Sequence, residues 1–215
     1  DIPYEVAITN SLSTLNLLNS IEFAIKNLEY TPKIIFASSS EVYGSANMIP
    51  TDENATTYLR TNEDRDSYAA GKLMSEFYIK LFAKKFELDY FIFRIFNVFG
   101  PRMISTQYGQ VIPELINKAI CSKGFLELIG SGEETRTFCY IDDHVDLTLN
   151  AIEKAKSCET YNLGNPEEIS IKKVAKIIQS VLGKELAIRT SLPRSGDHSR
   201  RCPNIQKLIS FIDGY

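Results

Sequence analysis

Tyr68 and Lys72 have the side-chain types and the spacing of a proton-transfer pair. They stand four residues apart in the segment SYAAGK at 67–72, so a helix beginning there would carry both on one face. A phenol with a pKa of about 10 is a poor base, but a nearby ammonium group lowers that pKa. The pair could then take a proton from a hydroxyl group while hydride leaves the same carbon. Taken alone, the spacing is equally typical of a helix that carries a solvated lysine.

A run of three serines follows the apolar segment 34–37, which we predict to be a buried strand. Ligands of parallel sheets bind beyond the carboxyl ends of the strands, so a serine hydroxyl there could bond the oxygen that becomes a carbonyl. Serine clusters are also common in turns and helix caps. A second predicted strand, 90–95, is followed closely by Asn97. The joint pattern of serines, Tyr-x-x-x-Lys and asparagine favours a catalytic site.

Apolar periodicity predicts that helices and strands alternate along the chain. We expect helices at 5–29, 66–86, 109–121, 143–156 and 171–181, and strands at 34–37, 90–95, 125–129, 137–141 and 161–163. This alternation is typical of an α/β fold with a parallel sheet and right-handed crossovers. Residues 1–100 are expected to build the main sheet. Residues 101–215 should mainly form a smaller mixed lobe, with some segments returning to that sheet.

Composition argues against several classes of partner. The 215 residues are 44% hydrophobic and carry 24 basic and 27 acidic side chains, a net charge of −3 that gives no reason to expect nucleic acid or a membrane. The four cysteines and two histidines are scattered, so we expect no metal site. They are typical of free thiols in a reducing cytosol, and we expect a cytoplasmic protein.

Taken together, the motifs resemble those of the extended short-chain dehydrogenases/reductases, the NAD-dependent epimerases, dehydratases and decarboxylases of nucleotide sugars. The matching segments are SSSEVYG at 38–44, YAAGK at 68–72, RIFNVFGPR at 94–102, GSG at 130–132 with TR at 135–136, YNLGNP at 161–166, and GD at 196–197 with RRCP at 200–203. The resemblance implies a Rossmann-type, doubly wound parallel sheet in 1–100 that binds NAD. It also implies a sugar-nucleotide-binding lobe in 101–215.

The resemblance also implies a role for each matching residue. Tyr68 would be the base, Lys72 would lower its pKa and hold the nicotinamide ribose, and Ser39 would polarise the reacting 4-hydroxyl. Further NAD contacts are implied for Asn10, Ser38 and Phe96. Contacts to the sugar nucleotide are implied for Ser40, Asn97, Arg102, Arg136, Arg194, Arg200 and Arg201. Arginine suits bidentate recognition of anions, although most arginines are simply solvated.

Ser40 and Glu41 bear on the reaction. Members that dehydrate the sugar typically carry Asp-Glu at this point, and 4-epimerases generally lack the glutamate. The Ser-Glu pair, with FNVFGPRM at 96–103 and RCPNI at 201–205, is most similar to UDP-glucuronate decarboxylases. NAD⁺ would oxidise C4 and the C5 carboxylate would leave as CO₂, with Glu41 and Arg201 as candidate helpers. Alternatives are a dTDP-glucose 4,6-dehydratase or a UDP-hexose 4-epimerase, with Glu41 merely an acid at a helix start.

The chain departs from the family pattern at two points. Decarboxylases usually read Tyr-Asp-Glu-Gly-Lys where this chain has Tyr-Ala-Ala-Gly-Lys, and no glycine-rich phosphate loop occurs in the 215 residues. We therefore expect the opening strands of the family fold to be missing from this chain, which alone should bind NAD poorly. A glycine-rich loop encoded upstream of Asp1 would favour the enzyme. The alternative from another class is a truncated, non-catalytic paralogue that binds sugar nucleotides without NAD.

The resemblance also implies a homodimer. Family members commonly pair through a four-helix bundle, which the predicted helices at 5–29 and 66–86 would supply. Apolar residues such as Phe77 and Phe82 could serve that interface or simply the core.

Overall fold

The main sheet brings the carboxyl ends of three parallel strands to one edge. The computed structural model describes residues 3–105, 110–193 and 199–212. The strands, in the order β1-β2-β7, are β1 (Ile34–Ser39), β2 (Tyr90–Ile95) and β7 (Glu159–Leu163). Ser39 pairs with Ile95, which in turn pairs with Leu163. The serine run and the segment leading to Asn97 therefore leave the sheet side by side.

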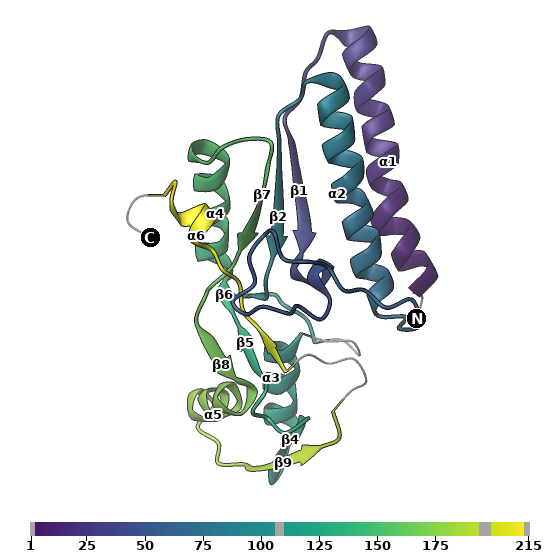
Figure 1. Ribbon diagram of the computed structural model, residues 1–215. Coiled ribbons are helices and arrows are strands. Elements are labelled where there is room, and N and C mark those ends of the chain that lie inside the picture. Colours follow the sequence, from purple (N-terminus) through teal and green to yellow (C-terminus); the bar gives the residue numbers. More distant parts are fainter. Residues whose placement is uncertain (1–2, 106–109, 194–198, 213–215) are drawn as a thin grey trace.

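Helices cover both faces of this sheet, as Figure 1 shows. The helices α1 (Pro3–Leu28) and α2 (Asp66–Phe86) lie on one face, and α4 (Ile141–Lys154) and α6 (Gln206–Ile209) on the other. The first core contains Leu18, Ile34, Ile79, Ala83, Leu88 and Ile92. The second contains Phe91, Phe93, Leu147, Ala151, Tyr161, Leu163, Leu208 and Ile212. Strand side chains alternate between these two cores, so the predicted parallel α/β fold is confirmed. Among the described helices, none is long and apolar enough to cross a membrane.

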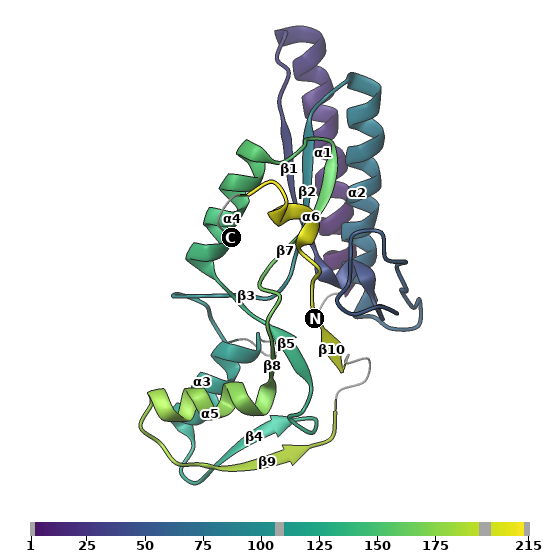
Figure 2. The ribbon, with the colours of Figure 1, turned by 60° about the vertical axis from the view of Figure 1, so that its left-hand side comes forward.

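A smaller lobe lies beyond the carboxyl edge of the sheet, in the lower part of Figures 1 and 2. It contains α3 (Val111–Cys121), α5 (Ile171–Val181) and the parallel pair β4 (Phe125–Ile129) and β9 (Ala187–Ser191). Its core includes Leu115, Ala119, Leu126, Leu128, Val174, Ala175 and Ile178. In α5 the buried positions recur every three to four residues, the spacing of an amphipathic helix.

Two small sheets connect the lobe to the main sheet. One has the order β10-β5-β8, with β10 (Arg200–Arg201), β5 (Thr135–Thr137) and β8 (Glu168–Ser170). The other pairs β3 (Val98–Phe99) with β6 (Cys139–Tyr140). The single strand predicted at 137–141 is therefore wrong. The chain changes sheets at Phe138 because β5 bonds to β8, whereas Cys139 donates its N–H to the Asn97 carbonyl, 2.9 Å away.

Gly44 fixes the start of the long polar segment at 45–65. It ends the short 3₁₀ helix η1 (Ser40–Tyr43) with a φ of +56°. Residues other than glycine rarely adopt this backbone conformation. A Cβ at this position would lie 1.8 Å from the Tyr58 carbonyl oxygen. The close approach holds the polar segment against η1, beside the end of β1.

Candidate active site

A cavity of about 1590 Å³ lies between the carboxyl edge of the main sheet and the smaller lobe. Pockets for one small ligand usually have about 300–1,000 Å³, so this volume has room for two bound molecules. Most of the predicted site residues line it: Ser38, Ser39, Ser40, Glu41, Tyr68, Lys72, Phe96, Asn97, Arg102, Arg136 and Arg201. The fold thus brings together residues that are up to 163 positions apart in the chain.

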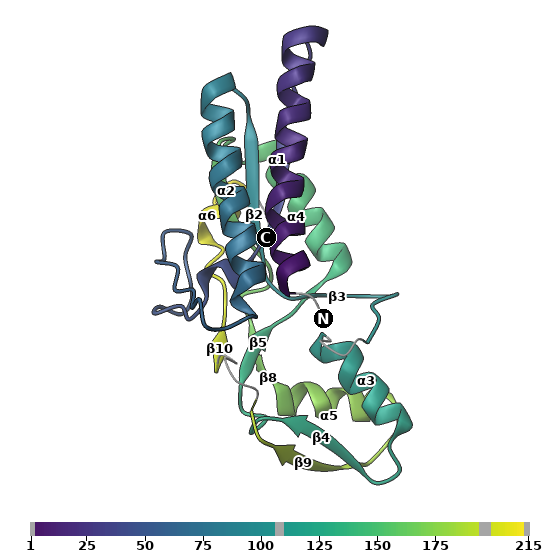
Figure 3. The same ribbon diagram turned by 90° about the vertical axis from the view of Figure 1, so that its right-hand side faces the viewer.

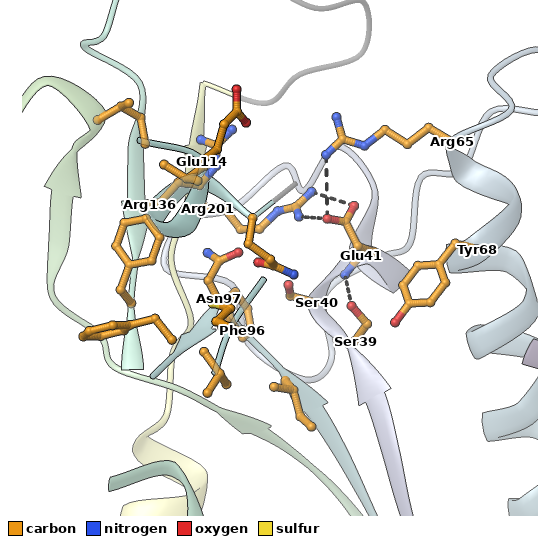
Figure 4. Close-up of a pocket in the computed structure, with 18 of the residues that line it drawn as sticks. Ser39, Ser40, Glu41, Arg65, Tyr68, Phe96, Asn97, Glu114, Arg136 and Arg201 are labelled. Atoms are coloured by element: carbon orange, nitrogen blue, oxygen red, sulfur yellow. Dashed lines mark hydrogen bonds and ion pairs between the residues drawn. The ribbon is translucent and has the colours of Figure 1, made fainter. Parts of the chain in front are cut away.

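Ser39 and Tyr68 meet at the end of β1. The Ser39 Oγ caps η1 by accepting the backbone N–H of Glu41 at 3.2 Å. Tyr68 stands in the first turn of α2, and Figure 4 shows its hydroxyl directed toward Ser39. Burial raises the pKa of Tyr68, a hydrogen-bonding interaction with the Ser39 side chain lowers it, and the charge of Glu41 raises it further. The net effect of these three causes is a raised pKa for Tyr68.

Lys72 is bound differently from our expectation. Its Nζ donates to the Ala37 carbonyl at 3.0 Å and lies 5.0 Å from the centroid of the Phe36 ring. The distance from Nζ to the Tyr68 ring centroid is 5.9 Å. Burial lowers the pKa of Lys72, and the pKa of Tyr68 is raised rather than lowered. In this structure the ammonium group approaches the Tyr68 ring, and burial of the phenol is the largest influence on its pKa and raises it.

Glu41 contacts arginines from two different parts of the chain. Arg201 of β10 binds it through both guanidinium nitrogens, with Nη1 on Oε1 and Nη2 on Oε2 at 3.1 Å. Arg65, just before α2, places Nη2 3.8 Å from Oε1 (Figure 4). Only 10% of the Arg201 side chain is exposed, so this bidentate pair is largely shielded from solvent screening. Arg65 was not among the predicted site residues. Its position three residues before Tyr68 was the signal that could have placed it near the site.

Asn97, which follows β2, and Arg136 of β5 line a wall of the cavity away from Ser39 and Tyr68. Asn97 donates from Nδ2 to the Thr137 carbonyl at 3.0 Å. Arg136 donates from Nη1 to the Thr135 carbonyl at 2.8 Å. Arg102 is exposed at the rim and has a φ of +69°. An amide and two guanidinium groups give this wall the donors that an anionic diphosphate requires.

Three predicted residues lie outside the cavity lining or outside the described residues, and a fourth, Ser38, lines the cavity but directs its hydroxyl away from it. The Ser38 hydroxyl points into the core and donates to Glu76 Oε1 at 2.6 Å. Arg200 does not line the main cavity, and its exposed guanidinium pairs with Glu168. Asn10 of α1 packs closely against Gly71 of α2, because a Cβ added at Gly71 would lie 3.0 Å from the Cβ of Asn10. Arg194 is outside the described residues.

The structure also adds residues that we did not predict. The polar face of α3 lines the cavity with Glu114 and Lys118, together with the N-cap residue Gln110. These residues recur every four positions, so helical periodicity was the signal that could have identified them. Glu127 of β4 and Glu134 also line the cavity.

Comparison with known proteins identifies the family. The model of the NAD dependent epimerase/dehydratase family matches residues 1–164. The chain belongs to this family. UDP-glucuronic acid decarboxylase 1 of Xenopus tropicalis is 32% identical over 205 residues, covering 95% of this chain and 47% of that protein. UDP-N-acetyl-alpha-D-glucosaminuronate decarboxylase of Bacillus cytotoxicus is 34% identical over 177 residues, covering 82% of this chain and 53% of that protein. The chain spans about half the length of these two curated relatives.

A solved structure from the same epimerase/dehydratase group is similar in fold. A mutant of UDP-glucuronic acid 4-epimerase from Bacillus cereus, in complex with UDP-4-deoxy-4-fluoro-glucuronic acid and NAD, has a TM-score of 0.79. It is 27% identical, with 95% of this chain and 62% of that chain covered.

The donor set at the end of β1 fits the nicotinamide end of NAD, the cofactor of the family. Two hydroxyls, from Ser39 and Tyr68, and the Lys72 ammonium group border one part of the cavity. The glycine-rich loop that holds the pyrophosphate in Rossmann folds does not occur in the 215 residues. The residues present therefore fit one half of the cofactor.

Proposed function

We propose that the protein carrying this chain oxidises C4 of a UDP-linked uronic acid and releases its C5 carboxyl group as CO₂. The observation that supports this best is the Glu41–Arg201 pair, which lies in the same cavity as Ser39 and Tyr68. A buried arginine can bind a carboxylate, and Glu41 can hold a proton beside the reacting carbon. Two relatives at 32% and 34% identity carry names of uronic acid decarboxylases.

The chain's own residues account for the proton movements. Ser39 donates a hydrogen bond to the sugar O4, and Tyr68 accepts the proton of that hydroxyl as hydride leaves C4. When bound, NAD⁺ accepts this hydride and later returns it to C4. Tyr68 accepts this proton as the phenolate, and the Lys72 ammonium group stabilises that phenolate until the proton arrives.

Decarboxylation follows from the new ketone. The C5 carboxylate is then β to a carbonyl, so the C5–carboxyl bond breaks, CO₂ leaves and the electron pair enters an enolate. The enolate oxygen at C4 is stabilised by hydrogen bonds from Ser39 and Tyr68. Glu41 and Arg201 assist protonation at C5, after which hydride returns to C4 and Tyr68 returns its proton to O4.

A panel of substrates tests the proposal. The protein, together with the longest natural protein that contains it, is incubated with NAD⁺ and UDP-glucuronate, UDP-glucose or dTDP-glucose, and the products are read by mass. We expect UDP-glucuronate to lose CO₂. Loss of water from dTDP-glucose, or an isomer of either UDP-sugar, would instead support the dehydratase or the 4-epimerase. Binding of sugar nucleotide without NAD affinity would support a non-catalytic binding protein.

Replacement of Arg201 should separate the two chemical steps. In Arg201→Met we expect release of labelled CO₂ to fall about 100-fold, because a preorganised charge at the carboxylate is lost. Oxidation at C4 should continue, so reduced nicotinamide should accumulate, as read by its absorbance. Arg189→Met is the matched control, because Arg189 is exposed on β9, 4.1 Å from the Phe125 ring centroid and outside the cavity lining. Equal CO₂ release by the two variants would contradict the role given to Arg201.

We also propose that the protein is a homodimer in the cytosol. The helices α1 and α2 lie side by side in Figures 1 and 3 and expose large apolar side chains, including Leu17, Phe23, Phe77 and Leu81. A second copy of the same pair would cover them and form a four-helix bundle. All four cysteines are free thiols, as in proteins of reducing compartments. Sedimentation should show a dimer for the protein and a monomer for Leu81→Lys, and an unchanged dimer would place the interface elsewhere.

A further inference from the structure

A third polar residue shares the face of α2 that carries Tyr68 and Lys72. Glu76 follows Lys72 by four residues and Tyr68 by eight, so the three side chains are stacked along one side of the helix. Only 2% of Glu76 is exposed. The proton movements described above do not use this carboxylate. A charge at such a depth is costly unless it is paired and hydrogen-bonded.

The Glu76 carboxylate bonds to both strands that border the site. It accepts the hydroxyl of Ser38 on β1, with 2.6 Å between Oγ and Oε1. Arg94 on β2 donates from Nε to Oε1 at 3.0 Å and from Nη2 to Oε2 at 2.7 Å. One side chain of α2 is therefore fixed to β1 and β2 by three charge-assisted hydrogen bonds.

Ser38 connects Glu76 to the site because it directly precedes Ser39 on β1. Side chains of consecutive strand residues point to opposite faces, so Ser38 faces Glu76 while Ser39 faces the cavity. The two residues share a peptide unit, and the position of Ser38 therefore limits that of Ser39.

The cap of α2 does not tie the helix to β1. Its N-cap residue, Arg65, makes no capping hydrogen bond from its side chain, and Tyr68 lies within the first turn that follows. The first turn is held to the preceding loop, since Asp66 accepts the Arg60 N–H at 2.8 Å and the Ser67 hydroxyl donates to the Asp64 carbonyl at 2.6 Å, but these bonds do not reach β1. The fixed points nearest to Tyr68 on this face are Lys72, bonded to the Ala37 carbonyl, and Glu76, bonded to Ser38.

We propose that Glu76 is a positioning residue that, through Ser38, sets the distance between Tyr68 on α2 and Ser39 on β1. The inference rests on the proposed oxidation at C4 and deepens it. A misplacement of about 1 Å between reacting groups can cost about 100-fold in rate. Because buried ion pairs contribute little net stability compared with apolar replacements, fixing this geometry gives the pair a reason to be present.

Ser38→Ala tests the proposal, since it removes the link to β1 and leaves the Glu76–Arg94 pair in place. We expect kcat to fall about 10- to 100-fold, with a KM for the sugar nucleotide that changes less than about twofold. Ser75→Ala is the matched control. Ser75 is a buried hydroxyl on the same helix, but it bonds to the Asn10 carbonyl at 2.6 Å and to Thr14 Oγ1 at 2.9 Å, both on α1. It should leave kcat unchanged.

A second readout does not depend on turnover. In protein labelled with ¹³C-tyrosine, the Tyr68 resonance is identified by its loss in Tyr68→Phe. It should move in Ser38→Ala and stay in place in Ser75→Ala. An unmoved resonance in Ser38→Ala, or equal losses of kcat in both variants, would overturn the positioning role. A wild-type protein that acts on none of the nucleotide sugars would contradict the proposed function, while the resonance would still report on Glu76.

Discussion

Replacing Tyr68 with phenylalanine is expected to lower kcat about 1,000-fold, because the variant lacks the group that we propose exchanges a proton with the sugar O4. The ring remains, so the packing against Lys72 and the shape of the cavity should be kept. Binding of the sugar nucleotide should change little, since the donors that we propose for its diphosphate lie on another wall of the cavity. The measurement is kcat and KM for product formation, together with the affinity for the sugar nucleotide by calorimetry.

Tyr161→Phe is the matched control for this variant. Tyr161 is fully buried on β7, and its hydroxyl donates to the Lys156 carbonyl at 2.8 Å, away from the cavity lining. Loss of this bond should cost about 1 kcal/mol of stability and leave kcat unchanged. A Tyr68→Phe enzyme that keeps most of its activity would show that another group accepts the proton.

Of the single substitutions considered, replacing Arg94 with methionine should lower the free energy of unfolding most, by about 3–5 kcal/mol. Arg94 is 6% exposed and binds both oxygens of the 2%-exposed Glu76. It also donates to the Glu53 carbonyl at 3.1 Å and stacks 4.8 Å from the Tyr43 ring centroid. Burial alone would lower the pKa of Arg94, but the hydrogen bonds and charge of Glu76 raise it. The variant leaves the buried Glu76 charge with only the partly exposed Lys80, whose Nζ is 3.9 Å from Oε2, as a cation, and this is the source of the penalty.

A second substitution separates the pair from the rest of the core. In Arg94→Met with Glu76→Leu no charge is left buried, so much of the lost stability should return. Urea unfolding followed by circular dichroism measures both variants. Arg200→Met is the control, because its pair with Glu168 is exposed and should matter little to stability. A double variant no more stable than Arg94→Met would contradict the account of the buried charge.

The main elements could be predicted because their patterns are long and regular. The bounds expected for α2 and β2, at 66–86 and 90–95, agree with the structure. The strands β8 and β10 were not predicted, since three and two residues are too few to show a period. The start of α4 was expected two residues too late because the change of sheet at Phe138 depends on contacts with β3 and β8, which are distant in sequence.

The sequence predicted which residues line the candidate site better than it predicted the contacts between them. Ser39, Tyr68 and Glu41 line one cavity, but the bond between Glu41 and Arg201 spans 160 residues and has no local signal. The placement of Ser38 was within reach, since strand alternation sets it opposite to Ser39. The raised pKa of Tyr68 was not, because it depends on how deeply the tertiary fold buries the phenol.

A single turnover tests the central claim, transient oxidation at C4 by the Ser39–Tyr68–Lys72 site, most directly. The protein, in its longest natural form, is mixed in excess over UDP-glucuronate with NAD⁺, and the absorbance of reduced nicotinamide is followed while products are quenched for mass analysis. We predict that the absorbance rises and then decays, that the product has lost CO₂, and that Tyr68→Phe shows neither signal. Release of CO₂ without any transient absorbance, or an unchanged transient in Tyr68→Phe, would contradict the claim.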